Sequence, residues 1–403
     1  MSDTPVVHNT QARASLASRL YHGITINTLQ TFGGCIRAAR SLYQWFYPLD
    51  VKPDFVKVYD CRPQLPIRIF FPKTYDQTSP QTLPTIFTTH GGGFCIGNPE
   101  DDDRLNERFA NMHNILVIAL NYRQIIRYDY KQDEYFPGQK IGPEKCKAPA
   151  YPFPTPIHDV EALMLAIFAD ESIPIDKNRI ALSGYSAGGN IMLSACQLPS
   201  IREQIKPAAI VSVYSTVDLS IFVPEKVAGR YYKPELKAGR RAHTTDYLAG
   251  IAPTFNWSYV PYGQELRDPL LSPYYAPREH LPPHIFFVAS ELDMLASESW
   301  RMANKIAGRP IPAIADMVGR RDVSSNPDSL ILDDERFAFE HVDANGKSSV
   351  RWLLVPDEVH GFDHLPASFL GPEDAVRSAH AKTVAYQRLV GEWLLSTAWK
   401  KES

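Results

Sequence analysis

Ser186 is the residue whose surroundings point most directly to chemistry. It stands in the motif GYSAG at 184–188, between a predicted strand at 179–183 and a predicted helix at 188–198. A serine flanked by glycines on a sharp strand-to-helix turn is held in a strained conformation that presents its hydroxyl above a sheet. This pattern predicts a nucleophile that attacks an acyl carbon and forms a covalent intermediate.

A glycine-rich loop, HGGGF at 90–94, directly follows a predicted strand at 85–89. Because glycines have no side chains, the backbone amides of such a loop can approach a developing oxyanion closely and stabilise it. A phosphate-binding loop is the alternative, but its GxGxxG spacing would require a glycine at Ile96, and no GxxxxGK[ST] motif occurs. The spacing therefore favours an oxyanion hole.

A serine nucleophile also needs a base and a carboxylate that orients the base, expected here in the chain order serine, carboxylate, histidine. His360 follows a predicted strand at 350–355, and Asp293 follows a predicted strand at 284–289. The ends of strands are where open α/β sheets place their functional loops. The residues alone leave three other carboxylates open for the orienting role: Asp268, Glu291 and Asp363.

His364 raises a metal site as a second interpretation, because it lies four residues after His360. The zinc motif HExxH is absent, however, and Gly361 and Pro366 predict a loop rather than a helix here. We therefore predict no metal ion and no other cofactor.

Several other polar and aromatic residues have less specific interpretations. Asp159 and Asp218 are expected to make structural hydrogen bonds, and the acidic run at 101–103 is expected to be a solvated loop or a helix start. The aromatic residues between 231 and 262 line an apolar pocket or form the core of a lid; they are Tyr231, Tyr232, Tyr247, Phe255, Trp257, Tyr259 and Tyr262.

The elements that must position these residues alternate between strands and helices along the chain. Unbroken apolar runs such as ILVIAL at 115–120 are typical of strands covered on both faces, which indicates a mostly parallel central sheet flanked by helices. The predicted fold class is therefore α/β. Further strands are predicted at 54–60, 66–71 and 209–214, and further helices at 157–168 and 374–397.

The remaining segments suggest a cap over this core. Apolar residues at helical spacing in 13–47 predict one or two amphipathic helices. We therefore divide the chain into N-terminal cap helices at 1–53 and a catalytic domain at 54–403. Within the domain we expect a cap insertion at 216–265 and surface insertions at 124–147 and 306–347.

Composition narrows the classes of function further. Charged residues make up 22% of the 403 residues and the formal net charge is −3, so no nucleic-acid partner is predicted. Five scattered cysteines without a CxxC pair indicate a reducing compartment. The first twelve residues lack the basic start and the apolar stretch of a secretory signal, and no run of about 18 apolar residues occurs, so we expect neither a signal peptide nor a membrane span. We expect a cytoplasmic protein without stable membrane insertion, and a homodimer is left open.

With these motifs in place, the chain from about residue 55 onward resembles the hormone-sensitive-lipase-like branch of the α/β-hydrolases. The resemblance rests on HGGGF, GYSAGGN at 184–190, LDML at 292–295 and VHGF at 359–362. It implies that the cap forms from the N-terminal helices and from the insertion after the sixth strand. It also implies specific roles: Ser186 as nucleophile, His360 as base, Asp293 as its orienter, and the amides of Gly92, Gly93 and Ala187 as the oxyanion hole.

Two features depart from the family pattern. The family commonly has an aspartate where this chain has Tyr185, and it usually has a short loop where this chain inserts about two dozen residues after Arg123.

Three functions follow from these residues. We predict a serine carboxylic-ester hydrolase that acts on small to medium soluble esters through an acyl-enzyme. An acyl transfer, lactonisation or elimination step with the same triad is the alternative within enzymes. A non-catalytic protein that binds a small ligand is the alternative from another class, and the intact set of Ser186, Asp293 and His360 argues against it.

Overall fold

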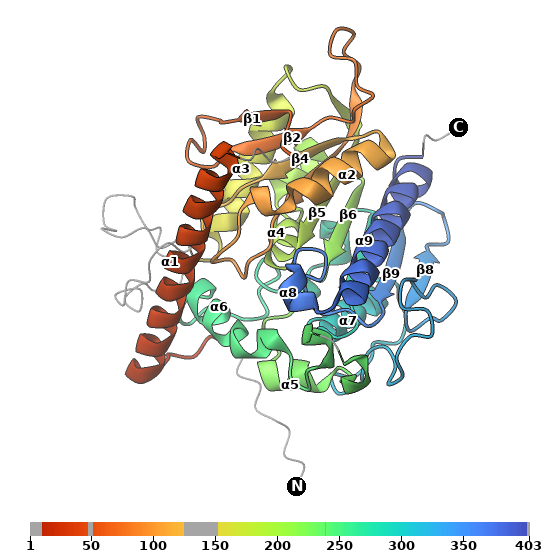
Figure 1. Cartoon of the computed structure of the whole chain (residues 1–403). Coiled ribbons are helices and arrows are strands. Elements are labelled where there is room, and N and C mark those ends of the chain that lie inside the picture. The colour runs from red at the N-terminus through yellow and green to blue at the C-terminus, as the bar shows by residue number, and fades with distance from the viewer. Residues whose placement is uncertain (1–9, 47–50, 125–151, 238, 401–403) are drawn as a thin grey trace.

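A nine-stranded sheet forms the centre of the computed structural model, which describes residues 10–46, 51–124, 152–237 and 239–400 (Figure 1). The strand order is β1-β2-β4-β3-β5-β6-β7-β9-β8. The strands are β1 (Phe55–Lys57), β2 (Ile67–Phe70), β3 (Leu83–Thr89), β4 (Leu116–Leu120), β5 (Ile175–Tyr185), β6 (Ala209–Val213), β7 (His284–Ser290), β8 (Ala338–Val342) and β9 (Ser349–Val355).

Six neighbouring strands in the middle of the sheet pair in parallel: β4, β3, β5, β6, β7 and β9. The edge pairings are antiparallel, with β1 and β2 at one edge and β8 at the other. Every residue of β3, β4 and β6 is buried, as the unbroken apolar runs predict. Because parallel strands end at the same edge of a sheet, the loops after β3, β5, β7 and β9 meet there. These are the loops that carry all the predicted site residues.

Helices cover both faces of the sheet, and each face has its own apolar core. One face is covered by α3 (Thr155–Ala169), α4 (Ala187–Ala195) and α7 (Ala296–Ile306), and the other by α2 (Asp103–His113) and α9 (Glu373–Trp393). Figure 1 shows α2 and α9 on the near side of the sheet. The predicted α/β class, with a mostly parallel sheet between helices, is confirmed.

The structure adds order to segments that the sequence left irregular. The expected surface insertion at 306–347 contains an edge strand, β8, which pairs with β9. Phe337 and Val318 of the same segment are fully buried, so part of it belongs to the core. The expected insertion at 124–147 lies outside the described residues from 125 onward.

The N-terminal segment forms a single long helix, α1 (Leu16–Phe46), which packs on α6 (Ala252–Tyr259) of the cap insertion. His22 Nδ1 lies 2.9 Å from Thr254 Oγ1, and Gln30 donates a hydrogen bond of 3.0 Å to the carbonyl of Cys95. Residues 1–9 and 47–50 of the predicted cap lie outside the described residues.

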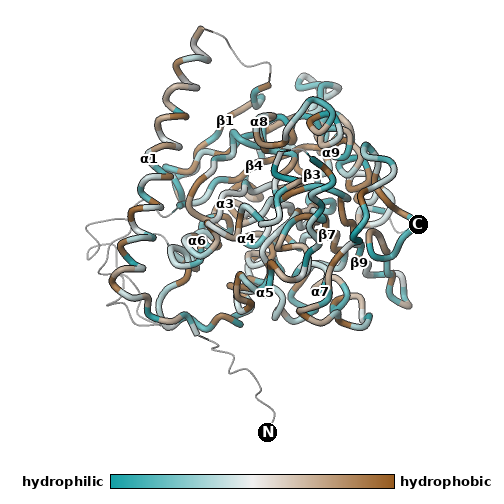
Figure 2. Tube along the Cα trace, turned by 60° about the horizontal axis from the view of Figure 1, so that its bottom comes forward, coloured by the Kyte–Doolittle hydropathy of each residue, from teal (hydrophilic) through white to brown (hydrophobic). Residues whose placement is uncertain are grey.

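Most of the large apolar side chains of α1 face solvent rather than the core. Ile26 is fully buried, but Figure 2 shows the C-terminal end of the helix standing clear of the body. The described helices include none that is long and apolar enough to span a membrane. The exposed apolar side chains are Leu16, Leu20, Tyr21, Ile24, Phe32, Ile36, Leu42, Tyr43 and Phe46.

Candidate active site

Ser186 occupies a sharp turn between β5 and α4. Its backbone has φ 53° and ψ −119°, a conformation that a non-glycine residue adopts only under strain. The turn is this tight because its neighbours lack side chains: a Cβ on Gly188 would lie 2.2 Å from the carbonyl oxygen of Thr89, and a Cβ on Gly184 would lie 2.4 Å from the carbonyl carbon of Gly188. The amide of Ser186 donates to Val213, which fixes the turn to β6.

His360 and Asp293 reach Ser186 from the loops after β9 and β7. His360 Nε2 lies 2.9 Å from Ser186 Oγ, and His360 Nδ1 lies 2.7 Å from Asp293 Oδ2. Of the four carboxylates that the sequence left open, Asp293 is therefore the one at the imidazole. Glu291 pairs with Lys233 instead, Asp363 accepts from Tyr214, and Asp268 accepts from the amide of Leu270.

The charge state of His360 is set by two opposing effects. Burial by itself lowers the pKa of the imidazole, but the carboxylate of Asp293, together with Asp246 and Asp363, outweighs burial and raises that pKa above its ordinary value. A base with a raised pKa binds the proton of the nucleophile more strongly, but it is also already protonated, and therefore inactive as a base, at a higher pH.

The HGGGF loop lies directly beside the nucleophile, since a Cβ on Gly91 would be 3.3 Å from Ser186 Cβ. Gly92 and Gly93 have φ of 116° and 57°, which favours glycine at both positions. Among the hydrogen bonds of the described residues, none uses the amide N–H of Gly92, Gly93 or Ala187. These three unused donors border Ser186, as an oxyanion hole requires.

The histidine of this loop has a structural role. The His90 ring stacks on Tyr122 at 4.4 Å between centroids, and the Tyr122 hydroxyl donates to the carbonyl of His90. The amides of Cys95 and Ile96 both donate to the carbonyl of Gly92. The loop is therefore held by Tyr122 and by its own backbone before any substrate binds.

The cap insertion contributes aromatic side chains to the site. Phe255 of α6 lies over the glycine loop, so that a Cβ on Gly93 would be 2.3 Å from its ring. The Tyr247 hydroxyl donates a 2.7 Å hydrogen bond to the carbonyl of His360. Tyr259, in contrast, is fully buried and stacks on Phe94 at 3.7 Å, so it belongs to the lid core.

Sequence reasoning missed a buried ion cluster that joins the cap insertion to both the acid and the base loop. Lys233 Nζ lies 2.7 Å from Glu291 Oε2 and 2.7 Å from Asp357 Oδ1, and the Lys233 side chain is fully buried. Glu291 precedes Asp293 by two residues and Asp357 precedes His360 by three. The ammonium group thus binds both loops to the cap insertion. The loops also contact each other directly, since the amide of Asp357 donates to Glu291 Oε2 at 2.8 Å and the amide of Leu292 donates to the carbonyl of Glu358 at 2.8 Å.

A second cluster fixes the base loop from two other elements. Glu358 accepts from Arg241 of the insertion at 2.7 Å and from Lys382 of α9 at 3.0 Å, and all three side chains are buried. Asp246 accepts from the amide of Met294 at 2.7 Å, which attaches the insertion to the acid loop as well. The 216–265 segment is therefore part of the scaffold of the site.

Other acidic residues have structural roles. Asp159 accepts from Arg62 and Arg123, in agreement with the structural role expected for it. The acidic run at 101–103 leads into α2, but Asp102 and Asp103 are buried rather than solvated.

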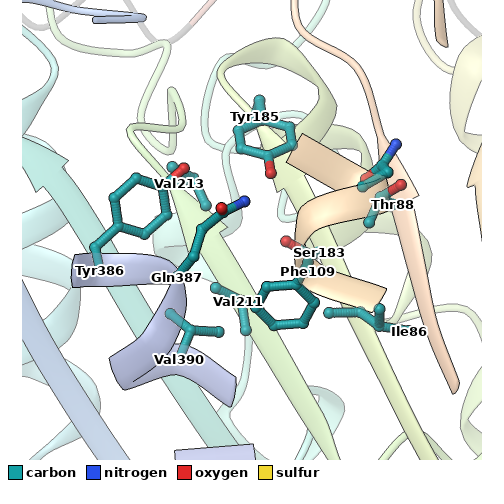
Figure 3. Close-up of a pocket in the computed structure, with 11 residues that line it drawn as sticks. Ile86, Thr88, Phe109, Ser183, Tyr185, Val211, Val213, Tyr386, Gln387 and Val390 are labelled. Atoms are coloured by element: carbon teal, nitrogen blue, oxygen red, sulfur yellow. The ribbon is translucent and has the colours of Figure 1, made fainter. Parts of the chain in front are cut away.

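A cavity of about 20 Å³ lies beneath the nucleophile turn, on the face covered by α2 and α9 (Figure 3). Its volume suits about one water molecule. Three buried polar atoms of the lining residues have no hydrogen-bond partner among the described residues: Thr88 Oγ1, Asn106 Nδ2 and Gln387 Oε1. Ser186 does not line it, so we interpret it as a hydration site rather than a substrate pocket.

Comparisons with known proteins agree with this geometry. A family model described as alpha/beta hydrolase fold matches residues 86–131 and 145–312. An arylesterase from Saccharolobus solfataricus is 25% identical over 256 residues, which cover 62% of this chain and 70% of the relative. An arylacetamide deacetylase from Oryctolagus cuniculus is 28% identical over 167 residues, covering 39% of this chain but only 35% of the relative.

A solved structure shows the same fold over nearly the whole chain. The Pyrobaculum calidifontis esterase superposes with a TM-score of 0.59 at 17% identity, and the match covers 96% of this chain and 100% of that one. Together, the fold and the arrangement of Ser186, His360 and Asp293 define a serine hydrolase. The chain belongs to the α/β-hydrolase family, and the resemblance of its motifs to the hormone-sensitive-lipase-like branch is confirmed.

Proposed function

We propose that this protein hydrolyses carboxylic esters through an acyl-enzyme intermediate. The observation that carries the proposal is the continuous hydrogen-bonded line from Ser186 Oγ through His360 to Asp293, beside three unused amide donors. A nucleophile, a base, an orienting carboxylate and an oxyanion hole are the parts that acyl transfer to water requires. The name of the arylesterase from Saccharolobus solfataricus supports the same reaction.

Each side chain has a defined part in the reaction. Ser186 Oγ attacks the ester carbonyl while His360 Nε2 takes its proton, and Asp293 stabilises the imidazolium through Nδ1. The negative charge on the carbonyl oxygen is stabilised by the amides of Gly92, Gly93 and Ala187. His360 then gives the proton to the leaving alcohol. A water molecule, activated by the same imidazole, cleaves the acyl-enzyme and restores Ser186.

The cap supports small to medium esters as substrates. Phe255 lies over Gly93, where the carbonyl of a bound ester would sit, and Tyr247 is fixed to the loop of His360. Two aromatic side chains so close to the reacting atoms limit the bulk that the site accepts on that side.

Covalent labelling tests the proposal directly. We expect a fluorophosphonate probe to add one mass equivalent to the wild-type protein and none to the Ser186→Ala variant. A series of nitrophenyl esters of increasing acyl length should be turned over, with kcat/KM falling for long chains. Labelling at another residue, or a labelled protein that turns over no ester of the series, would contradict ester hydrolysis.

We also propose a cytoplasmic location. The four cysteines in the described part of the chain are free thiols, which is typical of a reducing compartment. Fractionation of source cells with immunodetection tests this proposal, and a protein found in the medium or the membrane pellet would refute it. These cysteines are Cys35, Cys61, Cys95 and Cys196.

A further inference from the structure

A second histidine lies close behind the catalytic base and is held by two carboxylates. His364 Nδ1 lies 2.9 Å from Asp363 Oδ1, and His364 Nε2 lies 2.7 Å from Asp102 Oδ1. The side chains of Asp363 and Asp102 are 0% and 2% exposed, and that of His364 is 21% exposed. A neutral imidazole carries one N–H, so it can donate to only one of these carboxylates. While both carboxylates are ionised, both contacts are satisfied only by the imidazolium.

The directions of the pKa shifts are those expected for a protonated His364 beside ionised carboxylates. Burial lowers the pKa of His364, but the charges of Asp363 and Asp102 outweigh burial and raise it well above the ordinary value. Burial raises the pKa of Asp363, but His364 outweighs burial and the net pKa is lowered. The pair is therefore a charged one within a mostly dry region.

Tyr214 connects this pair to the catalytic base. Its hydroxyl donates to Asp363 Oδ1 at 2.6 Å and lies 2.9 Å from His364 Nδ1. Its ring stands edge-on to the His360 imidazole, with centroids 4.9 Å apart. Tyr214 has a φ of 37°, a strained value for a tyrosine that persists only where the surroundings fix the residue. The ring of Tyr214 thus forms a fixed wall beside the base.

The same histidine touches the other loops of the site. Asp102 lies in the short helix at Pro99–Asp102, which follows the HGGGF loop. The ring of Tyr185, the residue before the nucleophile, packs edge-on against His364 at 4.7 Å. Tyr185 is one of the two positions at which the chain departs from the family pattern given above.

We propose that the His364 imidazolium is a positioning residue for the reaction: held between Asp102 and Asp363, it fixes Tyr214 against His360 and joins the base loop to the oxyanion side of the site. The proposal rests on the ester hydrolysis proposed above. A catalytic base must keep its ring orientation while it gains and loses a proton, and small misplacements of reacting groups reduce rates strongly. Without the imidazolium, two carboxylates would remain in the interior without their cation, and the loops they belong to would separate.

The test compares His364→Gln with a matched control, His284→Gln. His284 is also partly buried, and its Nδ1 bonds to Ser349 at the opposite end of the sheet. Active sites are first counted by fluorophosphonate titration, so that kcat refers only to folded, labelled enzyme. We expect His364→Gln to lower kcat by about 10- to 100-fold with KM within about twofold, and to slow the labelling of Ser186 equally. The control should retain wild-type kcat.

Tyr214→Phe keeps the test valid if His364→Gln folds poorly, because it removes one hydroxyl group and leaves the ring. Tyr214→Phe should also lower kcat. Because both residues act through the same contact, the double variant His364→Gln/Tyr214→Phe should lose no more of its kcat than the less active of the two single variants. Unchanged kcat in both single variants, additive losses, or an equal loss in His284→Gln would overturn the proposal. Failure of the wild-type protein to label at Ser186 would instead count against ester hydrolysis itself.

Discussion

Replacing Lys233 with methionine should destabilise the protein strongly, because the ammonium group is the shared cation of two buried carboxylates. The side chains of Lys233, Glu291 and Asp357 are 0%, 0% and 2% exposed. Methionine fills a similar volume but leaves both carboxylates in the interior without a cation. Removing one partner of a buried ion pair costs about 3–5 kcal/mol. At about 2 °C per kcal/mol for a large domain, the melting temperature should fall by roughly 6–10 °C.

Thermal melts followed by circular dichroism measure this effect, with Lys57→Met as the control. Lys57 pairs with Asp170 at a partly exposed position, where an ion pair contributes less to stability than a fully buried one. Adding Glu291→Gln and Asp357→Asn to the Lys233 variant should recover part of the loss, because the unpaired charges are then gone. A Lys233→Met melting temperature as close to wild type as that of the Lys57 variant would refute the reasoning.

Three further predictions concern activity. The neutral form of His360 is the base and its pKa is raised, so kcat/KM should already fall as the pH drops towards about 6.5, the ordinary histidine value. Asp293→Asn should shift this acidic side of the pH profile to lower pH. An unshifted profile would show that Asp293 does not raise the pKa of His360. Phe255→Ala should raise kcat/KM for bulky nitrophenyl esters relative to acetate, and an unchanged ranking would show that Phe255 does not limit substrate size. Because α1 packs on α6, removing residues 1–47 should weaken discrimination among esters and lower solubility, while fluorophosphonate labelling of Ser186 remains intact. A monodisperse truncated protein that ranks the ester substrates as the wild type does would show that α1 is dispensable.

The side chains that meet in the candidate site could be predicted from the sequence because each carries a local signal. Ser186, Asp293 and His360 stand in short motifs directly after buried strands, and a parallel sheet brings such strand ends to one edge. The position after the strand and the LDML match to the family favour Asp293, but Glu291 follows the same strand, so the resemblance is what separates these two carboxylates. The structure shows why Glu291 is unavailable, since it is bound to Lys233.

The supporting contacts could not be predicted in the same way. Lys233 is 58 residues from Glu291 and 124 residues from Asp357, and no local pattern pairs a cap lysine with those two carboxylates. Helical periodicity in α1 revealed apolar side chains but not which of them would face the core, and Leu16 and Phe32 are exposed. The edge strand Ala338–Val342 could not be predicted either, because its sequence AFEHV does not alternate between apolar and polar residues and only one of its five residues is buried.

The ion clusters also determine how the selectivity of this enzyme can be changed. A cap taken from another member of the family would bring a new pocket wall, but it would remove Lys233 and Arg241 together with the old one. Three buried carboxylates of the acid and base loops would then lose a cation that now pairs with them; they are Glu291, Asp357 and Glu358. The cap is therefore not an exchangeable module. New specificities should arise here by single substitutions at positions such as Phe255, and a loop transplant would have to neutralise these carboxylates at the same time.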